Sequence, residues 1–451
     1  MKSPLTLLIG DALLSILAVH VSSLVRFGSL EEIYPYALDA ERLLVFALFA
    51  VFSSYLLELY DLEKQQRKRE VFVRTLIALT VTFLMLTPMY YSVPSLMLGR
   101  GLLVLSLGFF GVFQFLLHTG YARLINSAGL ARRVLVLGTG PLAKKIGDLI
   151  TTTNHQHILR GYVNLTGESA HVPPESIVGN GHGLVETVRE KQAQKLVVSL
   201  SERRGFFPVQ DVLNCKFSGI EVIDAPSFYE EMTGKLLIEN TTPSWFIFSN
   251  GFKMSASQRF NKRIFDLVFS LLGLIMTMPF LPLIALMIKV DSRGPVFFTQ
   301  VRVGELEKKF LLYKFRTMRP DAENDTGAVW AQKNDARVTR LGKLLRKTRI
   351  DELPQLYNVL IGQMSFIGPR PERPEFVGEL KKCIPYYSER HFVKPGVTGW
   401  AQIRYPYGAS VEDAVEKLRH DLYYIKNVSF FLDVLIVIET IKVMLFGRGA
   451  R

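Results

Sequence analysis

Four apolar segments near the start of the chain place the tightest constraint on its fold. They cover residues 4–25, 42–60, 72–92 and 99–118. Each approaches the ~20 residues that an α-helix needs to cross about 30 Å of hydrocarbon. The same apolar segments could instead form the buried helical core of a soluble domain. We predict a four-helix transmembrane bundle within residues 1–125.

The positions of Lys and Arg predict how this bundle is oriented. The connection between the second and third segments reads EKQQRKRE, and Arg123, Arg132 and Arg133 follow the fourth segment. The connection after the first segment is acidic instead. Because cytoplasmic loops are enriched in Lys and Arg, both ends of the bundle should face the cytoplasm. The first segment is interpreted as a membrane anchor and not as a cleaved signal peptide.

A change of pattern follows the bundle. Residues 132–150 read RRVLVLGTGPLAKKIGDLI, an apolar strand, a glycine turn at Gly138 and Gly140, and a helix. This is how a Rossmann-like unit opens, so we predict a Rossmann-like α/β module over residues 131–250. The next predicted strand ends at Asn164, where a ribose-binding acid is expected. Nucleotide binding and a structural or regulatory role both stay open.

A fifth apolar stretch, residues 264–290, differs from the first four. It contains Pro279 and Pro282 near its middle, and proline inside a helix removes a backbone donor and bends or breaks the helix. Basic residues flank both ends, which favours both ends on the cytoplasmic side. These are Lys262, Arg263, Lys289 and Arg293. We predict a bent re-entrant membrane helix, with a simple fifth span as the alternative.

The chemistry centres on an acidic pair in the basic, mostly α-helical domain of residues 255–451. The net charge of +13 indicates anionic partners. Residues 333–349 contain seven Lys or Arg against one acid, and Asp351 and Glu352 follow directly. Apolar spacing after Asp351 predicts an amphipathic helix, so the pair lies near its N-terminus. A helix-capping role is the alternative reading.

Further cations lie in two short motifs around this pair. Lys308, Lys314 and Arg316 belong to EKKFLLYKFRTM, and Arg370 lies between two prolines in SFIGPRPERPEF. The prolines restrict the backbone around Arg370, so its guanidinium loses little conformational entropy when it binds a ligand. An arginine held in this way suits phosphate recognition. Two carboxylates among cations indicate phosphoryl transfer, in which one acid attacks phosphorus and the other shares Mg²⁺ with the phosphates.

Other classes of protein fit less well. The two cysteines, Cys215 and Cys383, are far apart in the sequence, which argues against a disulfide framework or a zinc site. The membrane spans argue against a nucleic-acid partner. The apolar tail at residues 429–451 carries charges and is predicted to lie in the membrane interface.

Several motifs in this order resemble one family, the bacterial polyprenyl-phosphate sugar-1-phosphate transferases, also called monotopic phosphoglycosyl transferases. The matching motifs are KRIFD (262–266), GPVFFTQVRVG (294–304), YKFRTM (313–318), DELPQL (351–356), GQMSFIGPRPE (362–372) and KPGVTGWAQI (394–403). The N-terminal spans and the Rossmann-like module resemble the larger, exopolysaccharide-type members. The resemblance implies a bacterial inner-membrane protein whose catalytic domain faces the cytoplasm.

The resemblance also implies a mechanism and a set of site residues. Asp351 would attack the β-phosphate of a UDP-sugar and release UMP, while Glu352 holds Mg²⁺. The sugar-1-phosphate would then pass to a polyprenyl phosphate, undecaprenyl phosphate, in the first membrane step of exopolysaccharide synthesis. The substrate-binding set is Lys308, Arg316, Arg346 and Arg370. The sugar and the formation of a homo-oligomer stay open.

Two departures and two alternatives accompany this interpretation. Met278 stands where many members have Ser before the helix-breaking proline, and Glu307 stands where many have Gly. One alternative is a membrane-attached NAD-dependent nucleotide-sugar dehydratase or epimerase. Such enzymes need a Tyr-x-x-x-Lys pair downstream of the glycine turn. The sequence has this spacing only at Tyr60–Lys64, which lies upstream of the turn and therefore argues against this alternative. The other is a non-catalytic assembly scaffold.

Overall fold

The computed structural model describes residues 2–446, apart from several short gaps. The gaps are 29–38, 58, 61–67, 127–130, 154–156, 166–168, 182, 200–206, 241–245, 247–248, 250, 320–334, 336, 406–407 and 409. Much of the predicted basic connection EKQQRKRE therefore lies outside the described residues. The chain divides into two compact units, Met1–Ala225 and Pro226–Arg451. The division into three domains stays a prediction.

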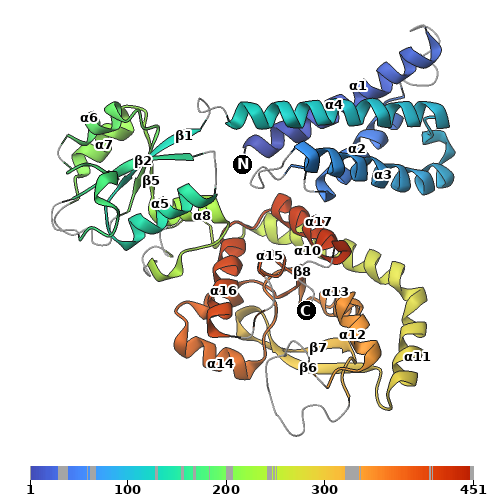
Figure 1. Cartoon of the computed structure of the whole chain (residues 1–451). Helices are drawn as coiled ribbons and strands as arrows, with labels where there is room; N and C mark the ends of the chain where they lie inside the picture. The colour runs from blue at the N-terminus through green and yellow to red at the C-terminus, as the bar shows by residue number, and fades with distance from the viewer. Residues whose placement is uncertain are drawn as a thin grey trace. The chain divides into compact units, whose positions relative to one another are not determined.

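Four helices form the first part of the N-terminal unit. They are α1 (Lys2–Phe27), α2 (Ala40–Leu56), α3 (Lys68–Ser92) and α4 (Arg100–Asn126). Both α1 and α3 pack against α2 and α4 (Figure 1). By length and composition, α1, α3 and α4 each contain a stretch that can cross a membrane, whereas α2 has 17 residues. The predicted helices are confirmed, and the crossing by α2 stays a prediction.

A buried polar cluster joins these otherwise apolar helices. Asp11 Oδ2 accepts hydrogen bonds from Tyr60 Oη at 2.8 Å and Gln114 Nε2 at 2.5 Å, and lies 3.0 Å from His118 Nε2. Gln114 also donates to Ser54 Oγ at 2.8 Å. All five side chains are buried. A polar group removed from water must find a partner, so the cluster ties α1, α2 and α4 together.

The cluster predicts a measurable loss of stability. The substitution Asp11→Ala leaves several buried donors without their acceptor, which should lower the stability of the protein by about 1–3 kcal/mol. The measurement is thermal unfolding of the detergent-purified protein. The control is Ser22→Ala, because Ser22 Oγ donates within its own helix, to the carbonyl of Ala18. Equal losses for the two variants would contradict a role in joining helices.

The second part of the N-terminal unit is an α/β module. Its strands are β1 (Arg132–Leu137), β2 (His157–Val163), β3 (Ile177–Gly179), β4 (Lys195–Val198) and β5 (Glu221–Asp224). All neighbouring strands pair in parallel, in the order β3-β2-β1-β4-β5. The helices between them are α5 (Pro141–Thr153), α6 (Leu184–Glu190) and α7 (Val209–Phe217). The predicted α/β architecture is confirmed.

The glycine turn between β1 and α5 bonds to its own module. Gly138 adopts φ 118°, a left-handed conformation that favours glycine. Thr139 Oγ1 donates to Asn164 Oδ1 at 2.9 Å, and the Thr139 carbonyl accepts from the His171 backbone N–H at 2.8 Å. These contacts fix the turn from within the module. The Rossmann-like character of the module stays a prediction, and nucleotide binding and a structural or regulatory role both stay open.

The C-terminal unit is mostly α-helical with two small sheets. Its helices are α8 (Ala225–Thr233), α10 (Ala256–Thr277), α11 (Leu281–Asp291), α12 (Arg340–Lys347), α13 (Gln355–Leu360), α14 (Pro374–Cys383), α15 (Trp400–Arg404), α16 (Val411–Lys426) and α17 (Phe430–Phe446). An antiparallel hairpin joins β6 (Phe297–Val303) to β7 (Lys309–Phe315), and β8 (Ser365–Ile367) pairs in parallel with β9 (Gly396–Thr398). The core gathers apolar residues from α10, α14, α16 and α17.

The predicted proline break is present in the long apolar helix. Ala256–Asp291 is long and apolar enough to cross a membrane. Its α-helical geometry gives way to a 3₁₀ turn, η4 (Met278–Phe280), and α11 continues in another direction (Figure 1). Met278 stands at the break where many family members have Ser, but the preceding residue, Thr277, also carries a hydroxyl. This hydroxyl donates to the Gly273 carbonyl at 2.7 Å. Entry and exit by one membrane face stay a prediction.

Polar side chains fix α10 against the rest of this unit. Asp266 Oδ1 accepts from Ser365 Oγ and from the Phe366 backbone N–H, each at 2.8 Å. Lys262 Nζ pairs with Asp433 Oδ2 of α17 at 3.0 Å. These contacts bind the start of the long apolar helix to β8 and α17, so the three elements form one framework.

Candidate active site

The acidic pair lies in a buried 3₁₀ turn, η6 (Ile350–Glu352), between α12 and α13. Asp351 is 8% exposed and Glu352 is 7% exposed. The following helix begins at Gln355 and has six residues, so Asp351 precedes the helix in a turn of its own. A helix this short has a small dipole. The positive potential at the pair must therefore come from side chains.

Three cations surround the Glu352 carboxylate. Its Oε1 accepts from Arg370 Nη2 at 2.9 Å and from Lys314 Nζ at 3.1 Å, and its Oε2 lies 3.5 Å from Arg349 Nη1. Burial alone would raise the pKa of Glu352, but Arg370, Lys314 and Arg349 outweigh burial and hold this pKa far below its usual range. Glu352 is therefore a carboxylate at neutral pH.

Asp351 experiences a different balance. Burial raises the pKa of Asp351, Lys314 opposes this rise, and the negative charge of Glu352 adds to it. Burial also lowers the pKa of Lys314, against the attraction of Glu352. Adjacent carboxyl groups with pKa values pushed apart are typical of sites where the two groups have separate tasks.

The loop that follows β8 carries Arg370 to the pair. Arg370 lies between Pro369 and Pro371, and its Nη1 donates to Gln402 Oε1 of α15 at 3.2 Å. The loop can approach β9 closely because residue 396 is a glycine and has no side chain. A Cβ at this position would lie 2.0 Å from the Gly368 nitrogen. Gly368, directly after β8, is equally confined, because a Cβ on it would lie 2.3 Å from the Lys394 carbonyl oxygen.

The other predicted substrate-binding residues lie in different settings. Arg346 of α12 is half-buried and donates from Nε to Thr317 Oγ1 at 2.9 Å, and its charge acts on Asp351. Lys308 is exposed at the end of the turn η5 (Glu305–Glu307). Arg316 is buried and donates to the carbonyls of Ser292 and Arg293 at 2.6 and 3.0 Å, at the end of α11.

The structure therefore brings Asp351, Glu352 and Arg370 together and places Arg346 within electrostatic reach. Three more residues belong to this cluster: one had been noted from the sequence only as a nearby cation, in YKFRTM, and the other two had no predicted role. The three residues are Lys314, Arg349 and Gln402. Each lies in or beside a motif that was already noted, YKFRTM, DELPQL or KPGVTGWAQI, and this was the available signal.

Comparison with known proteins assigns the family. The profile of the family described as bacterial sugar transferase matches residues 257–447. The exopolysaccharide production protein PSS of Rhizobium leguminosarum bv. phaseoli is 44% identical over 185 residues, which cover 40% of this chain and 92% of that protein. The chain belongs to the bacterial sugar transferase family. The resemblance predicted from the motifs is confirmed, and the matched region contains the acidic pair.

Two longer relatives extend the comparison with this sugar transferase. The UDP-N-acetylgalactosamine-undecaprenyl-phosphate N-acetylgalactosaminephosphotransferase of Aeromonas hydrophila is 44% identical over 237 residues, which cover 52% of this chain and 55% of the relative. The undecaprenyl-phosphate glucose phosphotransferase of Komagataeibacter xylinus is 35% identical over 330 residues, or 71% and 60% of the two chains. The match thus spans little more than half the length of these two relatives.

Glu307, which stands where many family members have Gly, is accommodated by its backbone turn and by a partner in α14. Leu306 and Glu307 adopt φ 51° and 60°, the left-handed region where glycine is favoured. The Glu307 carboxylate turns to α14 and pairs with Lys381 Nζ at 2.8 Å, and this hydrogen bond lowers the pKa of Glu307. The extra acid therefore has a partner of its own in Lys381.

The donor set around the pair is compatible with Mg²⁺ carried by phosphates. Glu352 is ionised, and its Oε2 has a longer contact, 3.5 Å to Arg349, than the two contacts of Oε1. Among the described residues, no group of three or more His, Cys, Asp and Glu side chains forms a metal site. Mg²⁺ commonly binds through one or two carboxylates together with substrate phosphates, so Glu352 fits such a site.

The contacts of Arg316 predict a structural effect. The substitution Arg316→Ala removes the hydrogen bonds of a buried guanidinium to two backbone carbonyls at the end of α11 and should lower the stability of the protein by about 2 kcal/mol or more. The measurement is thermal unfolding, with Lys308→Ala as the control because Lys308 is exposed. Losses of the same size would show that the Arg316 contacts contribute nothing special to stability.

Proposed function

We propose that this protein transfers a sugar-1-phosphate from a UDP-sugar to a polyprenyl phosphate, through a covalent intermediate on Asp351. The observation that carries the proposal is the buried pair Asp351–Glu352 within its cluster of cations. Membership in the bacterial sugar transferase family supports it. The names of both longer relatives contain undecaprenyl phosphate, and they name two different sugars. The acceptor class is therefore better supported than the sugar.

In the first step, an Asp351 carboxylate oxygen attacks the β-phosphorus of the donor. The bond between that phosphorus and the oxygen bridging the two phosphates breaks, and UMP leaves with the electron pair. Arg370, Lys314 and Arg346 supply positive charge around Asp351. Such cations offset the negative charge that would otherwise repel a carboxylate nucleophile from a diphosphate.

In the second step, an oxygen of the lipid phosphate attacks the same phosphorus. The bond to Asp351 breaks, the carboxylate is restored, and the product is a polyprenyl diphosphate sugar. Two displacements of this kind divide one difficult transfer into two easier ones. Because each displacement passes through the same aspartyl phosphate, the first can occur without the lipid.

Glu352 remains a carboxylate throughout, because its pKa is held low by Arg370, Lys314 and Arg349, which outweigh its burial. We assign Glu352 as the protein ligand of Mg²⁺. When bound, Mg²⁺ would neutralise charge on the diphosphate and orient it. Arg370 contacts the same carboxylate and so lies beside the place where the phosphates would bind.

The membrane arrangement follows from the two substrates. The nucleotide sugar is water-soluble and the acceptor is a lipid, so the site must lie at a membrane surface. A re-entrant helix over Ala256–Asp291, bent at Pro279, would hold the catalytic unit at the cytoplasmic face of the bacterial inner membrane. The polar ties from α10 to β8 and α17 would keep the site at a fixed depth.

The test is release of UMP from a panel of UDP-sugars, with and without polyprenyl phosphate. We expect wild-type protein to release at most one UMP per molecule without the lipid and to turn over repeatedly with it. The substitution Asp351→Asn should slow release by more than about a thousandfold, and EDTA should stop it. The matched control, Asp413→Asn at the start of α16, should stay near the wild-type rate. Normal release by Asp351→Asn would refute the mechanism.

A further inference from the structure

The backbone of the Arg370 loop is held at every carbonyl from Pro369 to Glu372. Each of these four oxygens accepts a hydrogen bond from a different donor. The donors are the Gly396 backbone N–H (2.9 Å, to Pro369), Arg390 Nη2 (3.0 Å, to Arg370), Arg302 Nη1 (3.2 Å, to Pro371) and the Val303 backbone N–H (3.0 Å, to Glu372). Prolines lack an N–H and limit internal hydrogen bonding, so the loop depends on these outside donors.

One side-chain donor, Arg390, is itself rigidly fixed. Arg390 is 5% exposed, donates from Nη1 to Tyr387 Oη at 2.7 Å, and pairs through Nη2 with Asp421 Oδ2 of α16 at 2.8 Å. Burying an ion pair costs desolvation energy that the attraction between its charges often fails to exceed. Stabilisation of the fold is therefore a weak explanation for this buried pair. The third contact of Arg390, with the Arg370 carbonyl, offers a second explanation.

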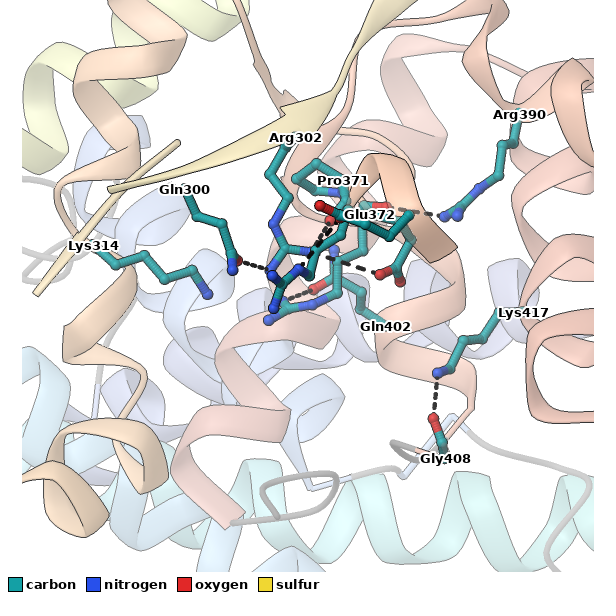
Figure 2. A network of polar contacts seen from close by, with 12 residues as sticks. Gln300, Arg302, Lys314, Pro371, Glu372, Arg390, Gln402, Gly408 and Lys417 are labelled. Carbon is teal, nitrogen blue, oxygen red and sulfur yellow. Dashed lines mark hydrogen bonds and ion pairs between the residues drawn. The ribbon is translucent and has the colours of Figure 1, made fainter. Parts of the chain in front are cut away.

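The other side-chain donor, Arg302, reaches the loop from β6. Its Nη2 donates to Gln300 Oε1 at 2.6 Å, and its Nη1 lies 3.7 Å from Glu372 Oε2 (Figure 2). Gln300 and Arg302 lie on the same face of β6, because side chains two residues apart in a strand point the same way. The glutamine thus holds the guanidinium that contacts Pro371.

Packing alone leaves the loop incompletely supported. A cavity behind it is lined by Arg370 and Arg390 and, among others, by Gly304, His391 and Val393. A void on one side of a segment forfeits the contacts that would otherwise resist its movement. The hydrogen bonds to the four carbonyls therefore restrain the backbone from which the Arg370 side chain extends to Glu352.

We propose that Arg302 and Arg390 are positioning residues, which aim the Arg370 guanidinium at Glu352 and the donor diphosphate without touching substrate themselves. This inference rests on the proposed function. Displacement of a catalytic group by about 1 Å can cost a hundredfold in rate. A change at either anchor should therefore act on the reaction through Arg370.

The test is a double-mutant cycle on the rate of UMP release at saturating UDP-sugar. Arg390→Lys and Arg302→Lys are each made in two backgrounds, the wild-type protein and the Arg370→Lys variant. Arg370→Lys keeps the positive charge but loses the planar guanidinium with its fixed pair of donors. With Arg370 present, we expect each to slow release about tenfold or more. In the Arg370→Lys background, each should slow release less than about twofold. Equal losses in both backgrounds, or no loss with Arg370 present, would overturn the proposal.

The matched control is Arg419→Lys. Arg419 lies on α16, as does Asp421, and pairs with Glu416 and Glu239. It should change the rate by less than about twofold in either background. If Arg390→Lys does not fold, as judged by thermal unfolding, Tyr387→Phe replaces it in the same cycle, because it removes one hydrogen bond to Arg390 and leaves Asp421 in place.

Failure of this inference is separable from failure of the proposed function. If wild-type protein releases no UMP from any UDP-sugar, the proposed function fails and the positioning role fails with it. If wild-type protein is active and Asp351→Asn is not, equal losses across the cycle remove only the positioning role.

Discussion

The contact between the buried Glu352 carboxylate and the guanidinium of Arg370 is the interaction on which the site depends. A carboxylate with 7% exposure loses most of its hydration, and an unpaired buried charge would be protonated or expelled. Arg370, Lys314 and Arg349 replace the lost water. Lys314 and Arg370 also place positive charge beside Asp351, so two of the groups that make burial of one acid tolerable also act on the acid that we propose attacks phosphorus.

The surrounding fold assembles this cluster from distant parts of the chain. Lys314 comes from β7, Arg349 from the turn before η6, and Arg370 from the loop after β8. Arg263 of α10 donates to the carbonyls of Val359 and Leu360, each at 2.7 Å, and so ties the end of α13 to the long apolar helix. The cluster is thereby linked to the segment proposed to enter the membrane.

Local patterns in the sequence predicted much of this structure. Apolar length predicted α1, α3, α4 and the long helix, and Pro279 predicted its break at η4. Contacts between remote segments were beyond such patterns. Arg316 was grouped with substrate-binding cations because of its motif, and this role stays a prediction; its contacts with the Ser292 and Arg293 carbonyls could not be foreseen from the motif. The separate turn η6 was not predicted, because the apolar spacing after Asp351 was interpreted as one helix that begins at the acidic pair.

The most direct test of the account is mass spectrometry of the intact protein after incubation with a UDP-sugar in the absence of lipid acceptor. The account predicts an increase equal to one sugar-phosphate, located on Asp351 by peptide mapping and lost when polyprenyl phosphate is added. If protein that turns over normally with the lipid never carries this adduct at Asp351, transfer does not pass through that carboxylate, and the central claim is wrong.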